Sequence, residues 1–127
     1  MLKLGQVGPR IVIVDDDPSF LATVRVLLEA EGFVVVGEAL NGLDGVAAVA
    51  ALAPDIVLVD VNLPDIDGFE VVERLGDGAS APPVVLTSSR AAVDFGKLVE
   101  TSRARGFISK ADITGKVLAE LLDRSTA

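Results

Sequence analysis

Five short, almost wholly aliphatic runs are the feature that most limits how this chain can fold. They cover residues 11–14, 33–36, 56–59, 84–86 and 107–108. Continuous aliphatic runs of this length are typical of strands in a parallel sheet, because such strands are covered on both faces. The chain therefore has to provide helices for both faces of one sheet.

The segments between these runs have the spacing of helices. Pro18 stands where the first turn of a helix accepts proline, and Asp17 before it is a good N-cap. Apolar residues then recur at helical intervals until Gly32. Further helices are predicted over residues 43–52, 69–75, 94–103 and 113–122, with Asp112 as the cap of the last one. The alternation predicts an α/β fold with a parallel sheet between two helical layers.

Length and charge narrow the class of protein further. A chain of 127 residues predicts one domain. We expect a flexible leader over residues 1–9, the domain over 10–123 and a C-terminal tail over 124–127. The net charge of −8 argues against direct binding to nucleic acid or to anionic membranes. No apolar run reaches the roughly 18 residues that cross a bilayer, so the expected location is the cytoplasm.

Polar side chains follow the predicted strands at the point where each strand ends. Residues 15–17 are three consecutive aspartates after the first run, and Asp60 follows the third run. Thr87 comes directly after the fourth run, and Lys110 lies just beyond the fifth. In open parallel sheets, ligands bind outside the carboxyl ends of the strands. We therefore expect these groups to meet at one edge of the sheet.

The combination of these groups indicates phosphoryl chemistry. Clustered carboxylates need a countercharge, and Mg²⁺ supplies one while keeping coordination sites for water and phosphate. Lys110 and Thr87 can bind phosphate oxygens, and Asp60 can attack phosphorus as a nucleophile. Each residue alone has a simpler interpretation, as a helix cap or a surface charge, so the prediction depends on their convergence.

The sequence resembles the receiver domain of two-component response regulators. The run from Asp60 to Gly68, with Pro64 four positions after the aspartate, is similar to the phosphoacceptor loop of that family. Residues 14–18, 86–88 and 107–110 are similar to its acidic pair, its switch hydroxyl and its aromatic–lysine segment. The resemblance covers about residues 10–122. It implies a flavodoxin-like (CheY-like), doubly wound sheet of five parallel strands in the order 2-1-3-4-5, with five helices.

The resemblance also implies roles for individual residues. Asp60 would be the phosphoacceptor, and Thr87 and Lys110 would hold the phosphoryl oxygens. The Mg²⁺ ligands would be Asp16, Asp60, the backbone carbonyl of Asn62, and Asp15 through a bound water. Thr87 and Phe107 would form a switch that reshapes the face made by the fourth helix, fifth strand and fifth helix.

The family further implies partners. A sensor histidine kinase or a phosphotransfer protein would donate the phosphoryl group, and phosphorylation would favour a homodimer. The chain would not be an enzyme in its own right, and whether it promotes its own dephosphorylation stays open. Two positions differ from the usual pattern: Ala111 stands where a proline often follows the lysine, and Phe107 carries no hydroxyl.

Three other functions compete with the phosphorylation switch. Receiver-like interaction scaffolds that are never phosphorylated usually lack an acid, the acceptor or the lysine, all of which are present here. A phosphatase with a nucleophilic aspartate needs a second acid two residues later, where this chain has Asn62. A flavin site needs a small, polar phosphate loop after the first strand, where residues 15–17 would repel the phosphate.

Overall fold

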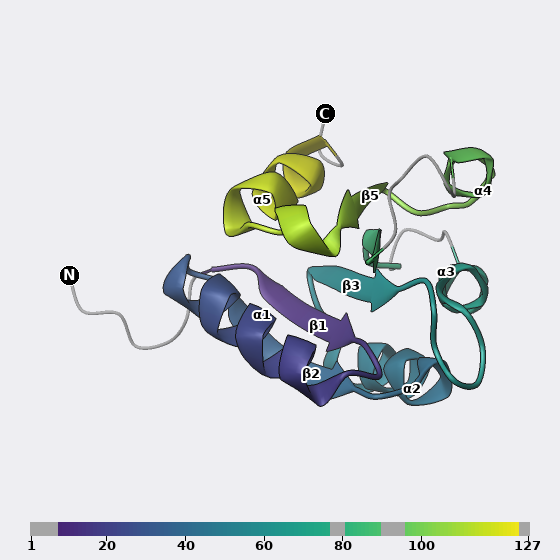
Figure 1. Cartoon of the computed structure of the whole chain (residues 1–127), viewed down its shortest axis with the longest axis horizontal. Coiled ribbons are helices and arrows are strands. Elements are labelled where there is room, and N and C mark those ends of the chain that lie inside the picture. Colours follow the sequence, from purple (N-terminus) through teal and green to yellow (C-terminus); the bar gives the residue numbers. More distant parts are fainter. Residues whose placement is uncertain (1–7, 77–80, 90–95, 125–127) are drawn as a thin grey trace.

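The computed structural model describes residues 8–76, 81–89 and 96–124. Strands and helices alternate along the chain, as the sequence predicts (Figure 1). The strands are β1 (Arg10–Val14), β2 (Val34–Ala39), β3 (Ile56–Asp60), β4 (Val84–Ser88) and β5 (Gly106–Ser109). The helices are α1 (Pro18–Ala30), α2 (Gly42–Leu52), α3 (Gly68–Leu75), α4 (Gly96–Thr101) and α5 (Gly115–Arg124), with a 3-10 turn at Lys110–Asp112. Most of the leader, most of the tail and the predicted start of the fourth helix lie outside the described residues.

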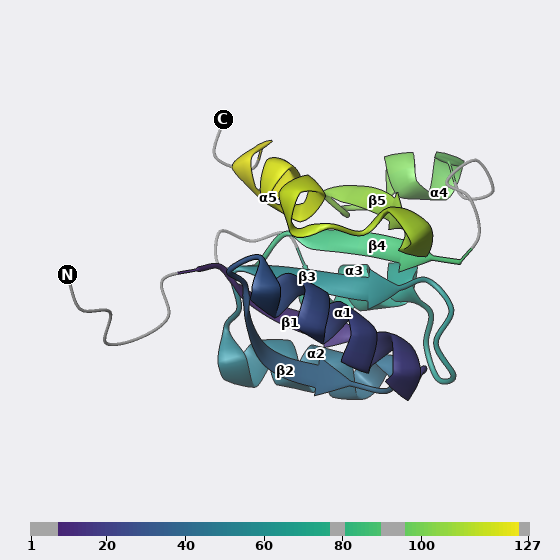
Figure 2. The same cartoon turned by 60° about the vertical axis from the view of Figure 1, so that its left-hand side comes forward.

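The strands form one parallel sheet in the order β2-β1-β3-β4-β5. This confirms the predicted fold class and strand order. All carboxyl ends lie at the same edge of the sheet, and in Figures 1 and 2 the arrowheads of β1 and β3 point to the edge where the loops before α1 and α3 begin. The register pairs Asp60 of β3 with Thr87 of β4, and Thr87 with Ile108 of β5.

The core consists of two layers, one on each face of the sheet. Alternate residues of a strand point to opposite faces, so Ile11 and Ile13 pack with α1 and α5, whereas Val12 and Val14 pack with α2 and α3. Figure 2 shows α1 in front of the sheet and α2 behind it. Every residue of β3 and β4 is buried, which explains why their sequences are continuously apolar up to the polar ends.

Local signals account for the first three helices. Asp17, Asn41 and Asp67 each accept a backbone amide from the first turn of the helix that follows. Asp17 was predicted as a cap and is one. Among the described residues, no helix combines the length and the apolar character that a membrane crossing requires.

The start of the last helix differs from the prediction. Asp112 belongs to the 3-10 turn, and α5 begins at Gly115. The cap is Thr114, whose Oγ1 accepts the amide of Val117 at 3.1 Å. The prediction of Asp112 was therefore wrong, because the turn consumes the residues after Lys110. The amide of Gly115 also donates to the carboxylate of Glu31, which joins the end of α1 to the start of α5.

Candidate functional site

Asp15 is the first residue after β1, and it is fully buried. Its Oδ1 accepts the backbone amide of Asp17 at 2.9 Å, a contact that the turn into α1 enforces. Its Oδ2 accepts no hydrogen bond of good geometry within the described residues. Burial raises the pKa of the Asp15 carboxyl above its ordinary value, and the neighbouring Lys110 ammonium and the Asp17 amide only partly oppose this. The next residue, Asp16, is exposed.

Asp60 is the last residue of β3 and is 4% exposed. Its Oδ1 accepts the amide of Asn62 at 3.0 Å, and its Oδ2 accepts Nζ of Lys110 at 3.1 Å. Asn62 itself is exposed, two positions along the loop toward α3. The carboxylate is thus fixed by one contact from its own loop and one from Lys110, which follows the edge strand β5.

Lys110 joins the two buried acids. Its Nζ lies 2.8 Å from Oδ2 of Asp15 and 3.1 Å from Oδ2 of Asp60. The Phe20 ring of α1 lies below the same ammonium, with its centroid 4.3 Å away, which is within cation–π range. Partial burial lowers the pKa of Lys110, but the two carboxylates outweigh it and hold the pKa above its ordinary value. Lys110 is therefore a fixed positive charge at neutral pH.

Asp15, Asp16 and Asp60 can each offer one oxygen to a common point, because these oxygens lie within 4.8 Å of one another. When ionised, three carboxylates face one ammonium, which leaves an excess of negative charge. A hard divalent cation with oxygen ligands would neutralise it. The buried Oδ2 of Asp15 lies 2.8 Å from Nζ of Lys110 but accepts no hydrogen bond of good geometry among the described residues, so it also suits such a site or a water bound by it. The residues present therefore fit Mg²⁺.

The predicted switch residues, Thr87 and Phe107, lie on β4 and β5, the two strands that follow β3 toward the edge of the sheet. Thr87 is 1% exposed, and its Oγ1 donates to the carbonyl of Ile108 on β5 at 2.6 Å. Phe107 is half-buried and packs against the core layer of α2 and α3. The hydroxyl of Thr87 is thus next to the acids in register, but its proton is used in a contact with the edge strand.

Comparison with known proteins settles the family. The model of the response regulator receiver domain matches residues 11–122. The chain belongs to this family. It is therefore a receiver domain of the kind found in the response regulators of two-component systems, as the sequence predicted.

Several relatives carry the same domain within longer proteins. The receiver domain is 36% identical over 110 residues to the virulence factors putative positive transcription regulator BvgA of Bordetella pertussis, covering 86% of this chain and 52% of the relative. It is 30% identical over 110 residues to the DNA-binding transcriptional activator EvgA of Escherichia coli K12, covering 87% of this chain and 54% of the relative. The chain thus spans about half the length of these curated relatives.

Solved structures agree on the fold. The receiver domain of the putative response regulator NarL from Mycobacterium tuberculosis aligns with a TM-score of 0.77 and 28% identity, covering 91% of this chain and 97% of that one. A CheY-like receiver domain protein from Methanospirillum hungatei aligns with a TM-score of 0.76 and 25% identity, covering 93% of both chains.

Two residues of the receiver domain's site were not singled out from the sequence. Phe20 has the spacing of a core residue of α1, and nothing local indicates that its ring meets Lys110. Asp65 lies in the loop between Asp60 and α3, yet its carboxylate binds the start of α2. The sequence pattern identifies polar residues at the ends of strands. Phe20 lies in a helix and Asp65 in the middle of a loop, so the pattern misses both.

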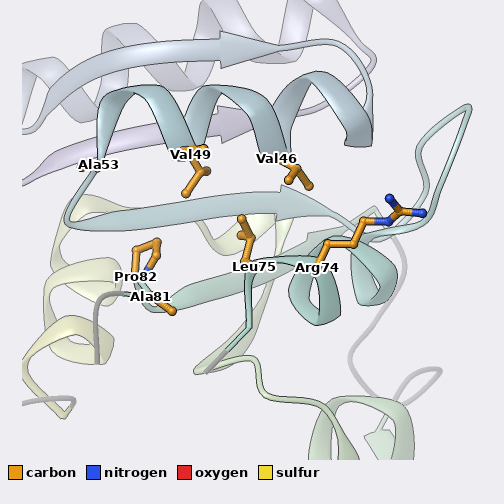
Figure 3. Close-up of a pocket in the computed structure, with 8 residues that line it drawn as sticks. Val46, Val49, Ala53, Arg74, Leu75, Ala81 and Pro82 are labelled. Atoms are coloured by element: carbon orange, nitrogen blue, oxygen red, sulfur yellow. The ribbon is translucent and has the colours of Figure 1, made fainter. Parts of the chain in front are cut away.

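A separate hollow lies between α2 and α3 (Figure 3). It encloses about 550 Å³ and is mainly apolar, with Val46 and Val49 on α2 facing the side where Leu75 and Pro82 lie. Arg74 provides the charged group of its lining. None of the clustered acids contributes to it, so it is distinct from the candidate cation site.

Proposed function

We propose that this receiver domain accepts a phosphoryl group on Asp60 in a reaction that requires Mg²⁺. The observation that supports this most strongly is the meeting of three carboxylates, of which two are buried and paired with one lysine. Burying the carboxylates of Asp15 and Asp60 costs free energy of folding, and binding a cation or a phosphoryl group gives a functional reason for that cost. A purely structural role would be served better by apolar residues at these positions.

The cation would be held by Asp15, Asp16, Asp60 and the backbone carbonyl of Asn62, and it would offset charge on the transferring phosphoryl group. One carboxylate oxygen of Asp60 forms a bond to phosphorus while the bond from phosphorus to the donor breaks, and the donor leaves with the bonding electron pair. Lys110, already paired with Asp60, would follow the negative charge onto a phosphoryl oxygen.

Thr87 would complete the binding of the phosphoryl group. Its hydroxyl has to leave the carbonyl of Ile108 before it can donate to a phosphoryl oxygen. That exchange frees β5 from one contact, and Phe107 on the same strand would then repack. The face formed by α4, β5 and α5 would thereby report the state of Asp60. A homodimer formed through this face on phosphorylation is part of the proposal.

The donor we propose is the phosphohistidine of a sensor kinase or a phosphotransfer protein, in the cytoplasm. The domain would not be an enzyme by itself. Two relatives are named as transcription regulators or activators, and each is about twice the length matched here. Binding to DNA is named for EvgA and is attributed to that protein as a whole. The net charge of −8 of this chain does not favour direct contact with nucleic acid.

Intact-mass measurement tests the proposal. The protein is incubated with acetyl phosphate, a small phosphoryl donor, with MgCl₂ or with EDTA. We expect a gain of one phosphoryl group that appears with MgCl₂, is absent with EDTA and is absent in Asp60→Asn. Asp112→Asn, which alters an exposed acid outside the cluster, is the matched control and should gain the group normally.

Other outcomes identify the competing functions. No gain in the wild-type protein under any condition would reject phosphorylation and favour an interaction scaffold. A gain that survives Asp60→Asn would place the acceptor elsewhere. Steady hydrolysis of a simple phosphate ester would favour a phosphatase.

A further inference from the structure

The loop that follows Asp60 is hydrogen-bonded to α2, a helix that has no part in the proposed phosphorylation. Asp65 in this loop accepts two backbone amides from the start of α2: Gly42 to Oδ1 at 2.8 Å and Leu43 to Oδ2 at 2.9 Å. We name these two hydrogen bonds the Asp65 clamp. Desolvation raises the pKa of the Asp65 carboxyl, but the backbone hydrogen bonds, chiefly those from Leu43 and Gly42, outweigh it and hold the pKa below its ordinary value. Asp65 is therefore ionised at neutral pH and suited to the positive end of α2.

Packing strengthens the same junction. The side chain of Ile66 lies so close to Gly42 that a Cβ built on this glycine would be 2.4 Å from Cγ1 of Ile66. Only a residue without a side chain allows the loop to approach the helix this far. The clamp is thus accompanied by a direct contact between the loop and the backbone of α2.

The other end of the loop is also fixed. The amide of Gly68 donates to the carbonyl of Val61 at 2.8 Å, and a Cβ on Gly68 would be 2.6 Å from the carbonyl oxygen of Asp60. Asn62, whose amide donates to Asp60, therefore lies in the loop that the hydrogen bond between Gly68 and Val61 closes and that the Asp65 clamp joins to α2. The conformation of the backbone at Asn62 depends on both.

We propose that Asp65 is a positioning residue for the cation site: by tying its loop to α2, it holds the backbone of Asn62 in the conformation that binds a divalent cation. The inference rests on the proposed function, since it concerns the same cation. It assigns α2 a part in the site although α2 supplies none of the candidate ligands.

The simpler interpretation is that Asp65 only caps α2. Asn41 provides the comparison, because it is the N-cap of the same helix and its side chain hydrogen-bonds to Asp44 of that helix: its Oδ1 accepts the amide of Asp44 at 2.8 Å, and its Nδ2 donates to the Asp44 carboxylate at 2.9 Å. If capping were the whole role of Asp65, then loss of either cap would have the same consequences. If Asp65 positions the loop, only its loss should reach the cation.

The test compares Asp65→Ala with Asn41→Ala and the wild type. Binding of Mg²⁺ alone is measured by titration calorimetry, and stability by urea unfolding followed by circular dichroism. Both variants should lose stability by removal of a cap. Only Asp65→Ala should bind Mg²⁺ more weakly, by about 10-fold, as is usual when a group supporting a metal ligand is removed. Asp65→Asn, which keeps one acceptor oxygen, should fall between Asp65→Ala and the wild type and serves if Asp65→Ala does not fold.

The outcomes separate this inference from the proposed function. If the wild type binds Mg²⁺ and Asp65→Ala binds it within twofold, or if Asn41→Ala weakens binding equally, the positioning role of Asp65 is overturned while the proposed function stands. If the wild type itself does not bind Mg²⁺, both fail. Faster hydrogen exchange at Gly42 and Leu43 in Asp65→Ala, with weaker Mg²⁺ binding, supports the inference.

Discussion

The central strands and the edge strand of this receiver domain hold their polar residues in different ways. β3 lies in the middle of the sheet, all five of its residues are buried, and Asp60 at its end is fixed by Asn62 and Lys110. β5 lies at the edge, has four residues and buries only Ile108. Phe107 beside it is half-buried. Asp60 is therefore held by a fully buried central strand, whereas Phe107 of the proposed switch lies on a partly buried edge strand.

This difference fits a division of labour. A reacting group needs a fixed position, and elements that move in regulation are drawn from the less stable parts of a fold. Two contacts bridge the regions: Lys110 reaches Asp15 and Asp60, and Thr87 donates to Ile108. Breaking each bridge separately measures how far the edge strand depends on the centre.

Replacing Lys110 by methionine should have the largest effect. It removes the cation from two buried carboxylates, and loss of one partner from a buried ion pair is costly, so we expect a loss of about 3 kcal/mol in the free energy of unfolding without divalent cations. Added MgCl₂ should recover part of this loss, because a cation binds only the folded acids. Urea unfolding with and without MgCl₂ measures both. A loss below about 1 kcal/mol would show that the acids do not depend on Lys110.

The pH dependence of this difference provides a further check. The pKa of Lys110 is higher in the folded protein than the ordinary value of 10.5. A group with a raised pKa stabilises the fold fully below its unfolded value and loses that contribution as the pH rises through the folded value. The gap between wild type and Lys110→Met should therefore stay constant from neutral pH to about 10 and narrow above 10.5. A gap that narrows near neutral pH would contradict the ion-pair explanation.

Thr87→Val should cause the next largest loss of stability, and the loss should be concentrated in the edge strand β5. Valine keeps the shape of threonine but leaves the carbonyl of Ile108 without its donor, so we expect a loss of about 1–2 kcal/mol. Native-state hydrogen exchange should accelerate at the amides of β5 more than at those of β1. Equal acceleration in both strands would mean that the sheet opens as one unit and that the edge strand is no less stable than the centre.

The sequence predicted the polar residues at the strand ends better than the contacts between distant segments, for a physical reason. Asp15 and Asp60 come at the end of fully buried apolar runs, so the end of the run marks the residue. Asp60 and Thr87 were both predicted to follow their strands but lie within them, and Thr87 continues the ladder and pairs with Ile108. The clamp of Asp65 on α2 depends on tertiary packing between distant segments, and no local pattern encodes it.

The start of α5 allows a smaller test of the edge region. Thr114→Ala should cost about 1 kcal/mol, the usual value for a lost N-cap. Asp112→Ala, two positions earlier and exposed, should change stability by less than about 0.5 kcal/mol. Paired urea titrations measure the two values. The reverse order would restore Asp112 as the cap and would imply that α5 starts earlier than Gly115.

The smallest predicted effect concerns the ring that lies against Lys110. Phe20→Leu removes core packing and the cation–π contact together, so the single variant cannot separate them. A double-mutant cycle with Lys110→Met isolates the term that belongs to the pair, which should be about 0.5–1 kcal/mol. Phe20→Tyr, which keeps the aromatic face, should retain most of it. A coupling of zero would mean that the ring only fills the core and that the carboxylates of Asp15 and Asp60 hold the Lys110 ammonium without help from the ring.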